Sequence, residues 1–143
     1  MSNTDDEISN ILSMKVIAVV GLSKDPARPS NDVASYLKAH GYRIVPVNPT
    51  VDEVMGEKSY KSLRDLPEQL RCEVEVVDVF RRPEDVLPIV DEAIELHSSI
   101  GHPKAVWMQL GIVNEEAAQK ARRSGLLVVM DRCMKIEHMR LGR

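Results

Sequence analysis

A glycine turn between an apolar run and a polar loop contains the residue types in this chain best suited to bind an anion. Gly21 ends the apolar run Val16–Val20, and Ser23, Arg28 and Ser30 follow it closely. Glycine lets the backbone approach a ligand, and the N-terminus of a helix presents unpaired N–H groups to anions. The segment therefore predicts a cradle for a phosphate group.

The spacing of this turn departs from the dinucleotide-binding fingerprint G-x-G-x-x-G. Ser23 stands where that fingerprint has its second glycine, and Pro26 stands where it has its third. A dinucleotide site also has an acidic residue at the end of the second strand to bind a ribose hydroxyl, whereas Asn48 and Pro49 occupy that strand end here. The sequence therefore favours another kind of nucleotide site, and an NAD(P)-linked oxidoreductase is the first alternative.

Other arrangements of catalytic residues have little support in the sequence. The P-loop motif and the G-x-S-x-G nucleophile elbow are absent, and Cys72 and Cys133 form no C-x-x-C pair. We expect both cysteines to be reduced, with Cys133 an inert buried thiol. No metal site is expected, because the histidines lack the spacing of metal ligands. They are His40, His97, His102 and His138.

Apolar runs of strand length alternate with segments of helical periodicity along the chain. This alternation predicts an α/β fold: a Rossmann-like, doubly wound parallel sheet with strand order 3-2-1-4-5, in a single domain over residues 1–143 with its core at about 16–141. The predicted strands are Val16–Val20, Arg43–Val47, a short one at Lys58–Tyr60, Val74–Phe80, Ala105–Leu110 and Leu126–Met130. The predicted helices are Asp5–Met14, one capped by Ser30 and ended by Gly41, Ser62–Leu70 with Pro67 in its first turns or splitting it, Pro83 to about His97, Asn114–Arg123, and one turn within Asp131–Arg143.

Parallel strands bring their carboxyl ends to one edge of the sheet, where ligands of such folds bind. The residues that follow the predicted strands include cations, small hydroxyl and amide groups and one aromatic ring. This set suits a phosphate-bearing ligand with an adenine-like base. Because adjacent side chains point apart, at most one of Arg81 and Arg82 is expected to face the site. The candidate binding residues are Gly21, Leu22, Ser23, Arg28, Ser30, Asn48, Pro49, Phe80, Arg81, Gln109, Gly111 and Lys135.

Composition limits the classes of partner. The 143 residues carry a net charge of −3, Lys and Arg are spread along the chain, and only 3% of residues are aromatic, so binding to nucleic acid is not expected. No apolar run approaches the ~18 residues of a membrane span, and the acidic N-terminus is unlike a signal peptide. We therefore expect a cytoplasmic protein with no membrane partner.

Five stretches of sequence, taken in order, resemble the stand-alone CoA-binding domain proteins. These are small Rossmann-like chains similar to the N-terminal domain of the succinyl-CoA synthetase alpha subunit. The resemblance runs from about Val16 to Leu141, and it is specific for the set rather than for any one stretch. The stretches are VVGLS (19–23) with RPS (28–30), VPVNP (45–49), VDVFRRP (77–83), WMQLGIVNEE (107–116) and MDRCMK (130–135).

The resemblance implies coenzyme A as the ligand. It implies that the turn 21–23 and Arg28 hold the CoA phosphates, that Asn48 and Pro49 lie beside the nucleotide, and that the segment 80–81 lies near the adenine. Gln109 and Gly111 are expected to face the same cleft from the next strand. The 3′-phosphate of CoA would repel a carboxylate, which agrees with the missing ribose-binding acid.

The same resemblance leaves the activity open. The synthetase subunit continues into a domain with a phosphorylated histidine that this sequence lacks, so its ligase reaction is not carried over. The leading hypothesis is a CoA-binding module without catalysis of its own, and a second alternative is a subunit of an acyl-CoA enzyme that needs a partner protein, as yet unknown. We also expect Gly21→Val to block CoA binding while leaving the fold largely intact.

Overall fold

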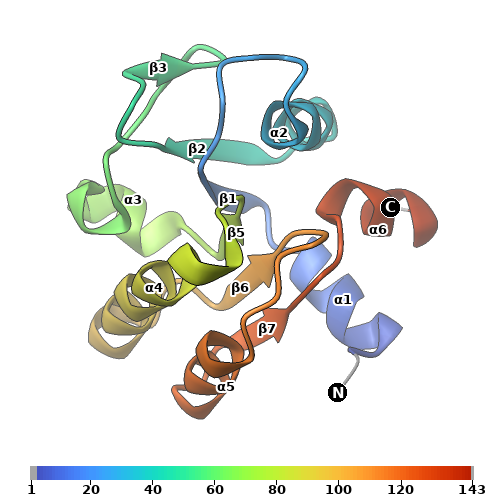
Figure 1. Ribbon diagram of the computed structural model, residues 1–143, viewed down its shortest axis with the longest axis vertical. Helices are drawn as coiled ribbons and strands as arrows, with labels where there is room; N and C mark the ends of the chain where they lie inside the picture. Colours follow the sequence, from blue (N-terminus) through green and yellow to red (C-terminus); the bar gives the residue numbers. More distant parts are fainter. Residues whose placement is uncertain (1–2, 143) are drawn as a thin grey trace.

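A five-stranded parallel sheet forms the centre of the computed structural model, which describes residues 3–142 (Figure 1). The predicted domain also includes residues 1, 2 and 143, which lie outside this range. The strands are β1 (Val16–Val20), β2 (Arg43–Val47), β5 (Val76–Val79), β6 (Ala105–Met108) and β7 (Leu127–Val129). They lie in the order β2-β1-β5-β6-β7 and confirm the predicted Rossmann-like α/β class.

Helices cover both faces of this sheet (Figure 1). One face carries α1, α2 and α6, and the other carries α3, α4 and α5 together with a short 3-10 turn, η1. A second 3-10 turn, η2, leads into α4. The ranges are α1 (Asp5–Leu12), α2 (Pro29–Ala39), η1 (Leu63–Asp65), α3 (Glu68–Glu73), η2 (Pro83–Asp85), α4 (Val86–Ile100), α5 (Glu115–Arg123) and α6 (Met134–Arg140).

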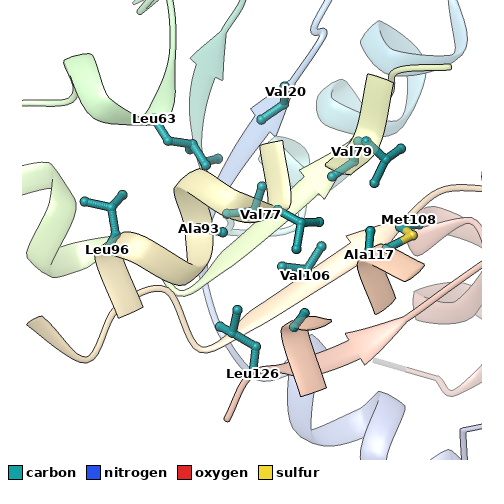
Figure 2. Packing of buried hydrophobic residues seen from close by; sticks show 14 of the residues in the cluster. Val20, Leu63, Val77, Val79, Ala93, Leu96, Val106, Met108, Ala117 and Leu126 are labelled. Carbon is teal, nitrogen blue, oxygen red and sulfur yellow. The ribbon is translucent and has the colours of Figure 1, made fainter. Parts of the chain in front are cut away.

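The core consists of two apolar layers, one on each face of the sheet. Successive strand residues point to opposite faces, so Val77 packs under α4 and α5 while Val76 belongs to the layer under α1, α2 and α6. Figure 2 shows the first layer, where Val77 and Val106 of the sheet lie near Ala93 of α4 and Ala117 of α5. Burial on both faces explains why the strands are continuous apolar runs. No helix within residues 3–142 is long and apolar enough to cross a bilayer.

The predicted third strand of the sheet at residues 58–60 is wrong except for a single bridge. Lys58 belongs to a separate antiparallel hairpin of β3 (Glu53–Val54) and β4 (Glu57–Lys58), and Tyr60 makes a single parallel bridge to Val47 of β2. Met55 and Gly56 both have positive φ, 56° and 78°, which is the geometry of a tight hairpin turn. Because Lys58 pairs within this hairpin, the chain joins the sheet only at Tyr60.

The predicted cap of α2 is also wrong, whereas that of α5 is confirmed. Helix α2 begins at Pro29, Arg28 occupies the N-cap position without a side-chain cap, and Ser30 lies inside the first turn. Proline suits this place because it lacks the N–H that would be unpaired there. At α5 the side chain of Asn114 accepts a hydrogen bond from the N–H of Ala117, 3.0 Å away.

Segment 131–142 is more ordered than the single helical turn that the sequence indicates. Its helix α6 is held by Glu137, a buried residue whose Oε1 accepts hydrogen bonds from Arg132 Nη1 at 3.2 Å and from Arg140 Nη2 at 2.8 Å. Arg140 also pairs with Asp5 of α1, 2.7 Å away. These charge pairs join the two ends of the chain across the same face of the sheet.

The carboxyl ends of β1 and β5 lie unusually close together at Gly21. The residue has φ +91°, and a Cβ built on it would lie 2.3 Å from the carbonyl oxygen of Phe80. Real Cβ atoms do not approach a backbone oxygen this closely, so only glycine fits. The expectation that Gly21→Val leaves the fold largely intact is therefore wrong.

We predict that Gly21→Ala lowers the free energy of unfolding by about 3 kcal/mol or more, since it adds a backbone clash to the strain of a positive φ. Urea denaturation measures the loss. Gly111→Ala is the matched control, because Gly111 has φ +82° with nothing within 4 Å of its added Cβ. That control should lose only about 1–2 kcal/mol, and equal losses in the two variants would contradict the close approach.

Candidate functional site

A cleft of about 640 Å³ opens along the carboxyl edge of the sheet. Its walls come from the β1–α2 loop, the residues that follow β5, β6 and β7, and the first turns of α2 and α6. A volume of this size is typical of sites for small molecules and cofactors. The lining residues are Gly21, Ser23, Arg28, Pro29, Ser30, Asp32, Val33, Phe80, Arg81, Gln109, Leu110, Ile112, Cys133 and Ile136.

Most of the residues predicted from the sequence come together in this cleft. Seven of the candidates line it: Gly21, Ser23, Arg28, Ser30, Phe80, Arg81 and Gln109. Four others line neither this cleft nor the second hollow described below. They are Leu22, which is fully buried in the core, Asn48, Gly111 and Lys135. Pro49 lines a second hollow.

The loop between β1 and α2 is held in shape by side chains from α2 and from the end of β2. The N–H of Ser23 donates to Ser30 Oγ at 3.0 Å, and Asn31 Nδ2 donates to the carbonyl oxygen of Ser23 at 2.8 Å. Asn48 Nδ2 reaches across from the end of β2 to the carbonyl oxygen of Leu22, 2.9 Å away. The loop therefore has a fixed geometry, and the N–H of Ser23 is already bonded within the protein.

Asn48 has a structural role at this edge. Its Oδ1 accepts hydrogen bonds from both the N–H and the hydroxyl of Thr50, at 3.0 Å and 2.8 Å, and only 7% of the residue is exposed. With these bonds and the one to Leu22, Asn48 holds the β1–α2 loop in position, and it does not line the cleft. The sequence signal, an Asn-Pro pair at a strand end, could not distinguish these two roles.

The cations around the cleft differ in whether they are paired with a carboxylate of the protein. Arg28 is exposed at the start of α2, and half-buried Arg81 lines the cleft. Arg82, in contrast, pairs with Asp85 at 3.0 Å and lies outside the lining, as the expectation of one facing arginine required. Lys135 is bound to Asp32, which lines the cleft, at 3.0 Å. The two arginines are therefore the cations best placed to meet an anion.

A second hollow of about 150 Å³ lies on the other side of the same sheet edge. Val20, Val47 and Leu63 of its lining belong to the core layer under α4, whereas Val33, Phe80 and Cys133 of the cleft belong to the opposite layer. Arg81 lines both spaces, so this residue lies between them. The hollow is lined by Val20, Val47, Pro49, Lys61, Ser62, Leu63, Arg81, Ile89 and Glu92.

A buried carboxyl group supports the floor of the cleft. Asp78 of β5 is fully buried between Val19 of β1 and Trp107 of β6, and its Oδ1 accepts a hydrogen bond from Gln109 Nε2 at 2.7 Å. Its Oδ2 has no hydrogen-bond partner within residues 3–142. Burial raises the pKa of Asp78 to about 7, and the hydrogen bond from Gln109 opposes the rise. Gln109 is thus oriented by Asp78, a role that sequence analysis missed.

Sequence reasoning also missed the apolar part of the cleft. Leu110, Ile112 and Ile136 line it although the first and last of them are exposed to solvent by 65% and 52%. The sequence alone does not show that these apolar residues are exposed, because an apolar residue in a helix or loop is usually predicted to lie in the core.

In the part of the chain that is described, no group of three His, Cys, Asp or Glu side chains could hold a metal ion.

Comparison with known proteins places this chain among CoA-binding domains. The family model described as "CoA binding domain" matches residues 15–139. An uncharacterized protein of Bacillus subtilis, YneT, is 41% identical over 133 residues, which cover 92% of each chain. A hypothetical protein from Pyrococcus horikoshii OT3 has a solved structure with 42% identity and a TM-score of 0.88, covering 99% of this chain and 94% of its own.

A longer enzyme shares part of this sequence. The ADP-forming acetate–CoA ligase of Methanocaldococcus jannaschii is 34% identical over 92 residues, which are 64% of this chain but only 12% of the ligase. The similarity therefore covers one region of a much larger protein.

The raised pKa of Asp78 predicts a pH dependence of stability. Because the native carboxyl keeps its proton up to about pH 7 while the unfolded one ionises near its usual value of 3.8, the free energy of unfolding should fall as pH rises between those values. The fall amounts to at most about 4 kcal/mol, and Asp78→Asn should remove it. Urea denaturation from pH 4 to 8 measures the effect.

The exposed Asp52 provides a matched control for this measurement. Asp52→Asn should keep the wild-type dependence on pH. Parallel curves for the wild type and Asp78→Asn would contradict the account of a buried, protonated Asp78.

Proposed function

The chain belongs to the CoA-binding domain family, and we propose that it binds coenzyme A across the carboxyl edge of its sheet. The observation that carries this proposal is the position of Arg28 and Arg81 around a cleft that starts at the glycine turn after β1. Guanidinium groups form charge-assisted hydrogen bonds with phosphate oxygens. The first turn of α2 adds backbone N–H groups that have no partner within the helix.

The two hollows suggest how the ligand is oriented. We place the nucleotide end toward β2, where Pro49, Lys61 and Ser62 line the smaller hollow, and the pantetheine arm toward β6 and β7. Arg81 lines both spaces and can follow the phosphates between them. In this orientation Phe80 and Gln109 meet the middle of the ligand.

The end of β2 agrees with CoA better than with NAD. An NAD site has a carboxylate there for the ribose 2′-hydroxyl, whereas this chain has Asn48, whose hydrogen bonds serve the loop. A ribose with a phosphate group would be repelled by a carboxylate at that point. The proposed function is therefore binding of CoA or a CoA thioester.

No catalytic step is assigned to this chain. The region shared with the acetate–CoA ligase is only 12% of that enzyme. A role as a CoA-binding subunit for a partner enzyme is compatible with this relation, and the chemistry would then come from the partner. The cytoplasm, where free CoA is available, is the compartment we propose.

Calorimetric titration with CoA, dephospho-CoA, NAD and NADP tests the proposal together with one variant. Arg28→Ala should weaken CoA binding by about 1.5–3 kcal/mol, or about 10- to 150-fold, through loss of a charge-assisted hydrogen bond to phosphate. Equal loss for CoA and dephospho-CoA would assign Arg28 to the pyrophosphate, and a larger loss for CoA would assign it to the 3′-phosphate.

Arg123→Ala is the matched control, since Arg123 is exposed in the last turn of α5 and lines neither hollow. It should bind CoA as tightly as the wild type. Binding of NADP without binding of CoA would contradict the proposal and favour the oxidoreductase alternative.

A further inference from the structure

The cleft is lined by large apolar side chains as well as by cations. Leu110 and Ile136 line it while 65% and 52% of their surfaces are exposed, and half-buried Ile112 lines it too. We call the part of the cleft that these three residues line its apolar end. Exposed large apolar side chains gathered at a concave site are typical of a surface that a ligand covers. The binding of phosphates by Arg28 and Arg81 does not require them.

The apolar side chains come from two sides of the cleft. Leu110 follows β6, which lies nearer the edge of the sheet than β1 and β5, the strands that precede Arg28 and Arg81. Ile136 lies on α6, which packs against α2, and its neighbour Lys135 is bound to Asp32 of α2. A ligand whose nucleotide lies toward β2, as proposed above, directs its far end past β5 toward Leu110. In CoA that far end is the thiol, which carries the acyl group in a thioester.

The apolar end is held in place by hydrogen bonds between its two loops. The N–H of Gly111 donates to Asp131 Oδ1 at 2.7 Å, and Trp107 Nε1 donates to the carbonyl oxygen of Arg132, also at 2.7 Å. The β6–α5 loop and the segment before α6 are thus connected across the cleft wall. The apolar surface is therefore a formed part of the cleft, fixed by the protein before a ligand is present.

We propose that this apolar end is a subsite for the acyl chain of a CoA thioester, and that the protein prefers acyl-CoA with several methylene groups to free CoA. This inference rests on the proposed function. A fully buried methylene contributes about 0.8 kcal/mol, which corresponds to about fourfold in affinity. Because the side chains stand at an open rim, we expect about twofold tighter binding for each methylene.

The test is a calorimetric series with CoA and its acetyl, butyryl, hexanoyl and octanoyl thioesters. Affinity should rise steadily along the series, and octanoyl-CoA should bind on the order of tens of times more tightly than acetyl-CoA. For each variant, the affinity for octanoyl-CoA is divided by that for free CoA, so that an effect on the phosphate end cancels.

Helix α6 offers a matched pair of variants. Ile136 and Met139 are both exposed apolar residues of this helix, by 52% and 60%, but only Ile136 lines the cleft. Ile136→Gln should lower the octanoyl-to-CoA ratio by about five- to tenfold, and Met139→Gln should leave it at the wild-type value. The loop offers a second pair, Leu110→Gln and its control Val113→Gln.

The outcomes separate the two proposals. Equal affinity for all thioesters with normal binding of CoA would overturn the acyl subsite and leave the proposed function standing. An equal fall of the ratio in Ile136→Gln and Met139→Gln would also overturn it, since the effect would then not be specific to the residue that lines the cleft. Absence of binding for CoA and for every thioester would overturn the proposed function itself.

Discussion

The close approach of the Gly21 backbone to the carbonyl group of Phe80 determines how the two central strands end. Because Gly21 has no side chain, the backbone after β1 can pass close to Phe80 while β1 and β5 stay paired up to Val20 and Val79, their last residues. The loop that follows β1 ends at Arg28 and the segment that follows β5 carries Arg81, and both arginines line the cleft. The close approach at Gly21 thus fixes where the two segments that carry these cations begin.

Hydrogen bonds hold the backbone around the cleft in place, while arginine and apolar side chains line the cleft itself. The Ser23–Ser30 bond and the Asn48–Leu22 bond fix the loop, and the Asp78–Gln109 bond fixes the floor. A site whose backbone is already fixed loses little conformational entropy when a ligand binds. Cations and exposed apolar side chains in one cleft then suit a long ligand that carries both phosphate groups and an apolar chain.

Much of the fold could be predicted from the sequence because apolar runs and helix caps are local signals. The runs that form β1 and β2 and the cap Asn114 fall where the pattern indicated. The third strand is reduced to the bridge between Tyr60 and Val47 because Lys58 pairs instead within the hairpin around Met55 and Gly56. A serine at the start of a helical pattern predicts an N-cap, but Pro29 occupies the first position of α2, so the cap position falls on Arg28.

The candidate site was predictable to a similar degree and for a similar reason. Residues that directly follow a strand, such as Ser23 and Gln109, had to lie at the carboxyl edge in a parallel sheet. Hydrogen bonds between segments far apart in the sequence decide which of these residues face the cleft. The bond from Asn48 to the carbonyl oxygen of Leu22 is an example, because it directs the Asn48 side chain to the loop. The exposure of Leu110 and Ile136 likewise depends on packing that one sequence does not display.

A crystal structure of the protein with bound CoA tests the central claim most directly, since it locates every part of the ligand at once. The account predicts pyrophosphate density within hydrogen-bond distance of Arg28 or Arg81 and a pantetheine arm that passes Gln109 toward Leu110. Density for CoA at any other surface, with an empty cleft in the same crystal, would contradict it.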